Sequence, residues 1–392
     1  MKHDLSDTTR YKEAEVPKSA RLAVAAVFFV GGAGLANWVA RIPEIQQKLG
    51  LSNGELGVGL LGTAVGAVLA MPTAGWLVAR FGSRPVTKLA ALGYCIVLPL
   101  PTLAPNLLLL TISLMVLGAF FGALDVSMNT QAVAVEQRYH RPIMSSFHGL
   151  YSAGGMVSAA SGGLIASLGI NPKSHLLGAA LLLGTVVAFA SIKLLYTEAN
   201  MTTESTFALP KKSLLQLGIL AFCVMLSEGA MADWSAVYLS QTLTTGPGLA
   251  AAGYTMFSLA MAVCRLSGDR PTQHLGPVRM VRFGGTIAAI GLGLSLIIAQ
   301  PLVTLIGFAC VGVGLSTLVP IVFSAAGRTP GIPSSQALAA VTTTGYCGFL
   351  CGPPLIGFVA DFLNLRIALG LVVVMCAMSA VLAPTVARGH KE

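Results

Sequence analysis

The chain has 392 residues, of which 55% are hydrophobic and only 10% are charged, and its formal net charge is +9. Soluble domains carry about 25% charged residues, so this composition excludes an ordinary soluble protein and indicates a membrane protein. All seven cysteines lie in apolar runs, which argues against a disulfide framework. Cys347 and Cys351 lie one helical turn apart, a spacing that packing explains better than metal binding. The charged first 20 residues predict no cleavable signal.

A membrane-spanning helix needs about 20 mostly apolar residues, and the chain offers twelve segments of this kind. We expect them at about 22–41, 55–79, 88–104, 107–134, 146–168, 175–196, 214–238, 248–267, 280–299, 301–325, 336–359 and 366–386. The sequence therefore predicts a multi-pass, all-α membrane protein.

The basic residues predict the orientation, because Lys and Arg are enriched in cytoplasmic loops. Of the 24 Lys and Arg residues, all but Arg41, Lys48, Lys173 and Arg366 fall on one side of these spans. We therefore expect both termini in the cytoplasm. The positive charge then follows from topology and contact with membrane lipid, and no nucleic-acid partner is needed.

A short stretch at the end of the first span recurs half a chain later. Leu35–Ala40 matches Met231–Ala236, and both copies contain a tryptophan. Glycines also recur at an offset of 194 residues, Gly82 and Gly276 among them. Parallel repeats of this kind predict two similar halves. The expected division is a tail at 1–21, a six-helix bundle at 22–196, a cytoplasmic linker at 197–213, a second six-helix bundle at 214–386, and a tail at 387–392.

Ionisable residues inside the fourth and fifth spans are candidates for proton coupling. Asp125 and Asn129 share one helical face, and a carboxylate within a membrane helix costs a few kcal/mol. We predict proton coupling by Asp125 and solute binding by Asn129, with a structural hydrogen bond as the alternative. His148 is expected near Asp125 as a second proton carrier, unless a helix neighbour simply satisfies its ring. Tyr151 follows it as a candidate solute contact.

The first and seventh spans carry the repeated stretch and two further acids. Asn37 corresponds to Asp233, so the halves differ there by one ionisable group. Glu228 and Asp233 are predicted to take the proton, and a solvated position at the outer boundary is the alternative for Asp233. Trp38 and Trp234 would offer flat faces to the solute, and Asn37 would bind its polar groups.

Charged loop residues are candidates for gating. Gly75–Arg84 contains Arg80, Gly82 and Arg84, and Asp269 with Arg270 occupies the related loop of the second half. A plain cytoplasmic loop rich in positive charge is the alternative. Arg41 runs against the charge trend, which predicts a specific partner among Glu44, Glu55 and Asp233. Two further expectations are that Arg265 extends toward the cytoplasm and that Pro353 and Pro354 bend their helix as a hinge or a fixed kink.

These features together resemble the major facilitator superfamily, and most closely a bacterial inner-membrane branch likened to fucose permease. The matching residues are Ala36-Asn37-Trp38 with Arg41 and Pro43, Asp125-Val126 through Glu136, Phe147-His148-Gly149, Glu228-Gly229, Asp233-Trp234, Thr343–Tyr346 and Gly352-Pro353-Pro354. The resemblance implies twelve helices in two pseudo-symmetric bundles, a central cavity lined by helices one, four, seven and ten, and alternating access. Ala79 departs from the acid that is usual in the loop motif, which puts the familiar gating ion pair in doubt.

The sequence thus predicts a secondary active transporter of a small polar solute, such as a sugar, that works by proton symport in the bacterial inner membrane. Proton-coupled efflux is the alternative. It is less favoured because Ser158-Ala159 stands where drug antiporters of the superfamily usually carry Gly-Pro. A transporter-like sensor fits less well, since the chain has only short tails and a short linker. We expect a monomer that is not an enzyme and needs no cofactor or metal.

Overall fold

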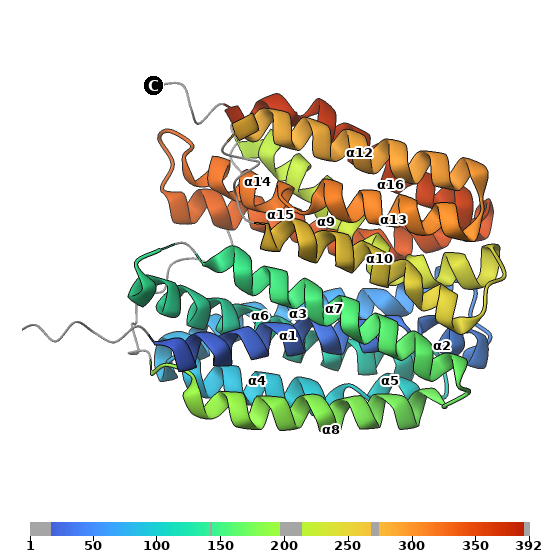
Figure 1. Ribbon diagram of the computed structural model, residues 1–392, viewed down its shortest axis with the longest axis horizontal. Helices are drawn as coiled ribbons and strands as arrows, with labels where there is room; N and C mark the ends of the chain where they lie inside the picture. The colour runs from blue at the N-terminus through green and yellow to red at the C-terminus, as the bar shows by residue number, and fades with distance from the viewer. Residues whose placement is uncertain (1–16, 142, 197–213, 268–273, 388–392) are drawn as a thin grey trace, which may run out of the picture.

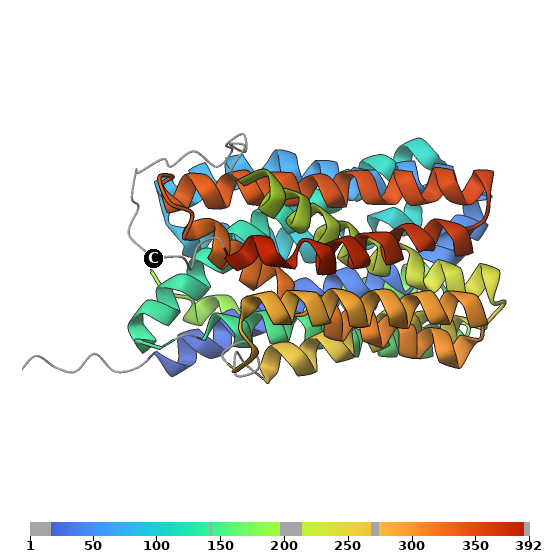
Figure 2. The same ribbon diagram turned by 90° about the horizontal axis from the view of Figure 1, so that it is seen from above.

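The computed structural model describes residues 17–141, 143–196, 214–267 and 274–387. These residues form helices joined by short connections, with no strand among them. The long helices run side by side along one axis (Figure 1), and the view from above shows the same alignment in both halves (Figure 2). We call the end at which α1 begins and η4 ends the terminus end, and the opposite end the far end.

The first half of the chain forms eight helices and one short helical turn. They are α1 (Lys18–Val39), α2 (Ile42–Leu49), α3 (Asn53–Phe81), α4 (Ser83–Val97), α5 (Leu100–Leu103), α6 (Leu107–Tyr139), α7 (Met144–Ser167), α8 (Pro172–Ala190) and η1 (Ser191–Lys193). The predicted third span is thus divided into a long and a short helix, and the short helix α2 follows the predicted first span.

The second half repeats this plan. Its described elements are α9 (Leu215–Val237), η3 (Tyr238–Thr242), α10 (Pro247–Leu266), α12 (Pro277–Ile298), α13 (Pro301–Leu315), α14 (Leu318–Gly327), α15 (Ser334–Phe362), α16 (Leu365–Val381) and η4 (Ala383–Ala387). The predicted tenth span is broken between α13 and α14. The helix α15 continues through Pro353 and Pro354. The predicted linker at 197–213 lies outside the described residues.

Eleven helical segments within the described residues are long and apolar enough to cross a membrane. The predicted fifth span, α7, falls outside this group although it is 24 residues long and runs alongside the others (Figure 1). Its five glycines and six serines lower its hydropathy. They also let it pack closely, because small residues bring membrane helices together. The count of twelve spans therefore stays a prediction.

Short polar side chains begin four of the helices that start at the far end. The oxygens of Ser52, Asn106, Asn171 and Asn364 accept hydrogen bonds from backbone N–H groups of α3, α6, α8 and α16. Such caps satisfy donors that the helix leaves unpaired. At the terminus end, the turns before α4 and α12 use Gly82 (φ 80°, ψ 160°) and Gly276 (φ 76°, ψ 158°). Only glycine adopts this conformation readily, so the repeated glycines serve the same turn twice.

The two halves meet along two helix pairs. Helices α1 to α8 pack among themselves, as do α9 to α16, while α7 packs against α10 and α3 packs against α15. In Figure 1 the blue-to-green helices form one layer and the yellow-to-red helices the other. Between these two pairs, α1 makes smaller contacts with α9 and α10. The predicted central cavity stays a prediction.

Candidate functional site

A carboxylate on α6 links the two halves. The Asn129 amide donates to Oδ1 of Asp125 over 3.1 Å, and the Tyr346 hydroxyl on α15 donates to Oδ2 over 3.3 Å. Asn129 also donates to the backbone carbonyl of Asp125 one turn earlier, which fixes its side chain. The predicted sharing of one face by Asp125 and Asn129 is therefore present. Tyr346, to which the sequence assigned no role, completes the contact from the other half.

Arg265 on α10 is the second link between the halves. Its guanidinium lies 3.6 Å from Glu228 on α9 and donates to the Ser152 hydroxyl on α7 over 3.1 Å. The backbone carbonyl of Ser316 accepts a further hydrogen bond over 3.4 Å. Ser152 belongs to the first half, whereas the other partners belong to the second. Arg265 therefore joins three helices and the break between α13 and α14.

The expectation that Arg265 extends toward the cytoplasm is wrong. Its side chain is only 11% exposed and turns into the bundle, toward the carboxylate of Glu228. The break between α13 and α14 leaves the Ser316 carbonyl without a helical partner, and within a membrane such groups must be satisfied by protein. Glu228 and this carbonyl together provide the negative charge and the hydrogen-bond acceptor that lipid headgroups would otherwise provide for the arginine.

Two tyrosines lie near the residues of these two links. Tyr151 on α7 is half-buried, and its ring is the nearest neighbour of Gly31 on α1. It also lies within electrostatic range of Tyr254, Glu228 and Asp125. Tyr254 lies on α10 and is buried. The predicted solute residue Tyr151 and the predicted proton residues Asp125 and Glu228 are therefore gathered in one region.

His148 lies on α7 beside Arg265, and its predicted proximity to Asp125 stays a prediction. Its ring is half-buried and packs edge-on against Phe28 of α1, with ring centres 5.3 Å apart. Arg265 lies within electrostatic range of this ring. A role for His148 in proton transfer would therefore run through the Arg265 link.

The repeated tryptophans belong to the packed core in this conformation. Trp38 is 2% exposed and Trp234 is fully buried, and both contact apolar neighbours. Asn37 is also buried and donates to the Ala33 carbonyl over 2.8 Å. Their predicted contact with solute therefore requires a conformation in which these faces become free.

Asp233 stands apart from both links. Its side chain is half-buried, and it makes no hydrogen bond or ion pair with another described residue. Tyr254 lies within its electrostatic range. A half-buried, unpaired carboxylate beside a tyrosine remains available for a proton or a polar solute.

Arg41 is held entirely within the first half, at the far end. Both oxygens of Glu44 accept from it over 2.8 Å, and Nδ1 of His175 on α8 accepts over 2.9 Å. The Ile170 carbonyl accepts a further bond over 3.0 Å. Of the three expected partners, Glu44 is the one found. Glu55 instead closes a capping box with Ser52. This network fixes the junction of α1 and α2 against α8.

The arginines of the loop between α3 and α4 contact groups in their own half. Arg80 lies over the rings of Trp76 and Phe81, at 5.3 Å and 5.5 Å from their centres. Arg84 donates to the Ile192 carbonyl over 2.8 Å. Asp269 and Arg270, the related pair of the second half, lie outside the described residues. The gating role of Arg80, Gly82, Arg84, Asp269 and Arg270 stays a prediction.

The far end carries a contact between the halves that sequence reasoning missed. Asp361, at the end of α15, accepts from the Ser52 hydroxyl and from the backbone N–H groups of Asn53 and Gly54, over 2.8–2.9 Å. A carboxylate at a helix N-terminus is favoured by the helix dipole. Beside it, the side-chain amide of Gln241 donates to the side-chain oxygen Oε1 of Gln46 over 2.8 Å. The only sequence signal for Asp361 is an acid that ends an apolar segment.

The family comparison and the relatives agree with this architecture. Residues 22–337 match the family model described as Major Facilitator Superfamily. An uncharacterized MFS-type transporter of Yersinia pestis is 38% identical over 361 residues, which cover 92% of this chain and 94% of the relative. The membrane protein MosC of Rhizobium meliloti is 34% identical over 366 residues, which cover 91% and 88% of the two chains.

Solved structures share the fold at low identity. A bacterial homologue of the human lysosomal transporter Spinster, in an inward-facing and unoccupied conformation, has a TM-score of 0.73 at 11% identity. It covers 96% of this chain, and 98% of its own length is matched. The nucleoside transporter NupG has a TM-score of 0.71 at 13% identity, with 95% and 99% of the two chains covered.

Proposed function

The chain belongs to the major facilitator superfamily and is a secondary transporter, and from this premise we propose that it carries a small polar solute across the bacterial inner membrane by proton symport. The basic residues at the terminus end support an orientation with both termini in the cytoplasm. The resemblance to fucose permease supports a sugar-like solute.

The observation that carries the proposal is that the carboxylates between the halves are tied to contacts across them. Asp125 accepts from Tyr346 of the other half, and Glu228 pairs with the arginine that also binds Ser152. Ionised groups in such an environment are costly unless they are paired. Protonation of Glu228 removes its attraction for Arg265 and weakens one link, so a proton biases the equilibrium between access states.

The contacts at the far end support alternating access. Asp361 and the Gln46–Gln241 pair hold the halves together there. Opening of this end requires these hydrogen bonds to break. A proton and a solute bound near the centre can shift the equilibrium toward or away from that open state. In the proposed orientation the far end faces the periplasm, so the described conformation is closed on that side.

The side chains around the centre support a polar solute. Asn129, Tyr151, Tyr254 and Tyr346 bring an amide and three hydroxyls to a region flanked by Asp125 and Glu228. Hydroxyl and amide groups can bind the hydroxyls of a sugar, and tyrosine rings can pack on its apolar face. The amide, the three hydroxyls and the two carboxylates of the site together favour a solute with several hydrogen-bond donors and acceptors.

The test is a screen of radiolabelled sugars and other small polar solutes in proteoliposomes, with and without an inward proton gradient. We expect one class to accumulate only with the gradient, and Glu228→Gln or Asp125→Asn to lower that accumulation at least about tenfold, which corresponds to about 1.4 kcal/mol. Glu55→Gln is the matched control, because the Gln side-chain oxygen can still accept from the Ser52 backbone N–H and so keep the start of α3 in place against Asp361. Accumulation that survives collapse of the gradient, or that both variants leave intact, would contradict the coupling mechanism.

A further inference from the structure

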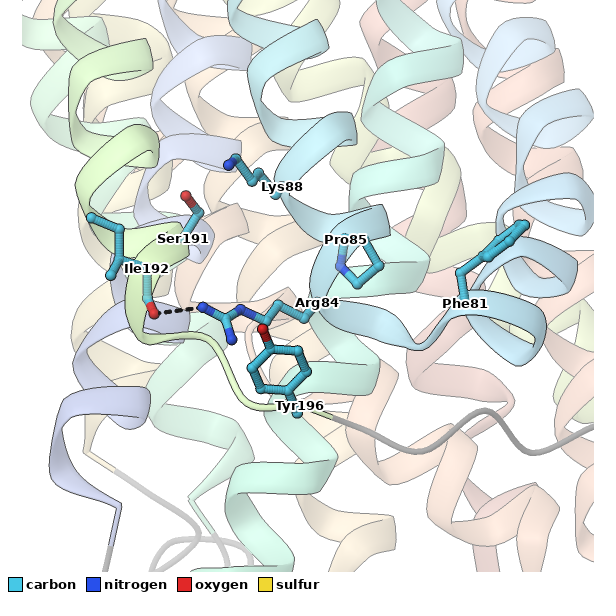
Figure 3. Close-up of a pocket in the computed structure, with 7 residues that line it drawn as sticks. All are labelled: Phe81, Arg84, Pro85, Lys88, Ser191, Ile192 and Tyr196. Carbon is cyan, nitrogen blue, oxygen red and sulfur yellow. Dashed lines mark hydrogen bonds between the residues drawn. The ribbon is translucent and has the colours of Figure 1, made fainter.

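A pocket of about 390 Å³ lies at the terminus end, away from the central residues. Figure 3 shows its walls, which come from the end of α3, the start of α4, η1 and the segment that follows η1. The lining residues are Phe81, Arg84, Pro85, Lys88, Ser191, Ile192 and Tyr196. They include two cations and no acid. None of them takes part in the two links between the halves, although Arg84 is also a gating candidate.

The two cations of the pocket, Arg84 and Lys88, differ in how their side chains are held. Arg84 donates one N–H to the Ile192 carbonyl over 2.8 Å and stacks on Tyr196, 4.1 Å from the ring centre. These contacts hold the guanidinium at the pocket while leaving other N–H groups to donate. Lys88, one turn later on α4, is exposed and makes no hydrogen bond or ion pair with another described residue. The pair therefore offers one anion a fixed positive charge on Arg84 and a second positive charge on Lys88, which has no partner among the described residues.

The surface beyond the pocket is apolar. On α4, Leu89 and Ile96 are 68% and 74% exposed, and on α8, Leu182 and Phe189 are 67% and 70% exposed. Each pair follows a helical face that leads from the pocket toward the middle of the bundle. In a membrane, such faces lie against acyl chains, and the ends of the spans lie at the headgroups. The pocket thus joins a cationic recess to a lipid-facing surface.

We propose that this pocket binds the phosphate of an anionic phospholipid, with Arg84 and Lys88 on the headgroup and the acyl chains along α4 and α8. Arginine recognises phosphate through its planar set of donors, and lysine adds a point charge. Basic pockets between spans on the cytoplasmic side suit anionic headgroups. Free phosphate shares the headgroup chemistry, but it would leave the apolar faces of α4 and α8 unused.

The test measures binding of phosphatidylglycerol, phosphatidylcholine and inorganic phosphate to the purified full-length protein by native mass spectrometry and by lipid titration in detergent. We expect phosphatidylglycerol to bind at least about tenfold more tightly than phosphatidylcholine, and millimolar inorganic phosphate not to displace it. Lys88→Gln should weaken that binding about threefold or more without a change in the thermal unfolding midpoint, because Lys88 has no hydrogen bond or ion pair to lose among the described residues. Arg84→Gln combined with Lys88→Gln should abolish the preference.

Arg279→Gln combined with Arg282→Gln is the matched control, since it removes two cations from the start of α12 at the same end of the bundle. We expect it to leave the preference for phosphatidylglycerol intact. Equal losses in the two double variants would reduce the binding to general surface charge and overturn the site. Displacement by inorganic phosphate, or equal binding of phosphatidylcholine, would also overturn the proposal for an anionic lipid.

Discussion

At the scale of single residues, the environment of each charge decides its role, and Arg265 illustrates this best. Its position at the end of an apolar helix is typical of an arginine that extends to the headgroups. The Ser316 carbonyl and the Glu228 carboxylate instead bring it inward. Neither partner is near it in sequence, so no local pattern could have identified the contact.

We predict that Arg265→Gln lowers solute uptake at least about tenfold, because Glu228 then remains as an unpaired charge among partly buried groups. Hydrogen bonds to charged groups contribute about 1.5–3 kcal/mol each. Arg265→Lys should keep part of the activity, since its charge stays although its multiple donors are lost. The measurement is the initial rate of uptake under an inward proton gradient. A fully active Arg265→Gln protein would remove Arg265 from the mechanism.

At the scale of helices, the sequence was informative wherever periodicity and composition carry the signal. The predicted spans coincide closely with the observed helices, because about 20 apolar residues in a row have few other structures available. The repeated Gly82 and Gly276 could be matched because the backbone turn restricts that position to one residue type. The break between α13 and α14 was missed, since it lies inside a continuous apolar run.

The packing of α3 against α15 gives a second prediction. A methyl group added at Gly57 would lie 2.5 Å from the Pro353 carbonyl oxygen, whereas one added at Gly75, on the same helix, would meet nothing within 4 Å. Overpacking of this kind costs about 1–3 kcal/mol. Gly57→Ala should therefore separate α3 from α15 and weaken closure of the far end, while Gly75→Ala should not.

Closure of the far end can be measured as the yield of a disulfide between Gln46→Cys and Gln241→Cys. The native Gln46 and Gln241 side chains are hydrogen-bonded to each other at this end. The background should carry Cys347→Ala and Cys351→Ala, since both thiols are exposed. We expect Gly57→Ala to reduce the yield of the disulfide severalfold and Gly75→Ala to leave it unchanged. Equal yields in the two variants would show that contact of α3 with α15 does not control the far end.

At the scale of the whole molecule, the halves are joined by a few polar links and two packed helix pairs. Sequence reasoning proposed the acids Asp125 and Glu228 because a carboxylate in a membrane span is costly. It could not find Tyr346, Ser152 or Asp361 as partners, because these contacts join segments more than 70 residues apart. The packing of the helices decides which residues face each other across the halves. Patterns along the chain do not predict these contacts.

Solute-dependent proton movement into proteoliposomes tests the central claim most directly. A pH-sensitive dye in the lumen is followed when the transported solute is added outside, with no imposed gradient. The account predicts that the lumen acidifies as the solute enters, and that Glu228→Gln and Asp125→Asn abolish acidification while Glu55→Gln does not. Solute entry without a change in pH, or with alkalinisation of the lumen, would contradict proton symport.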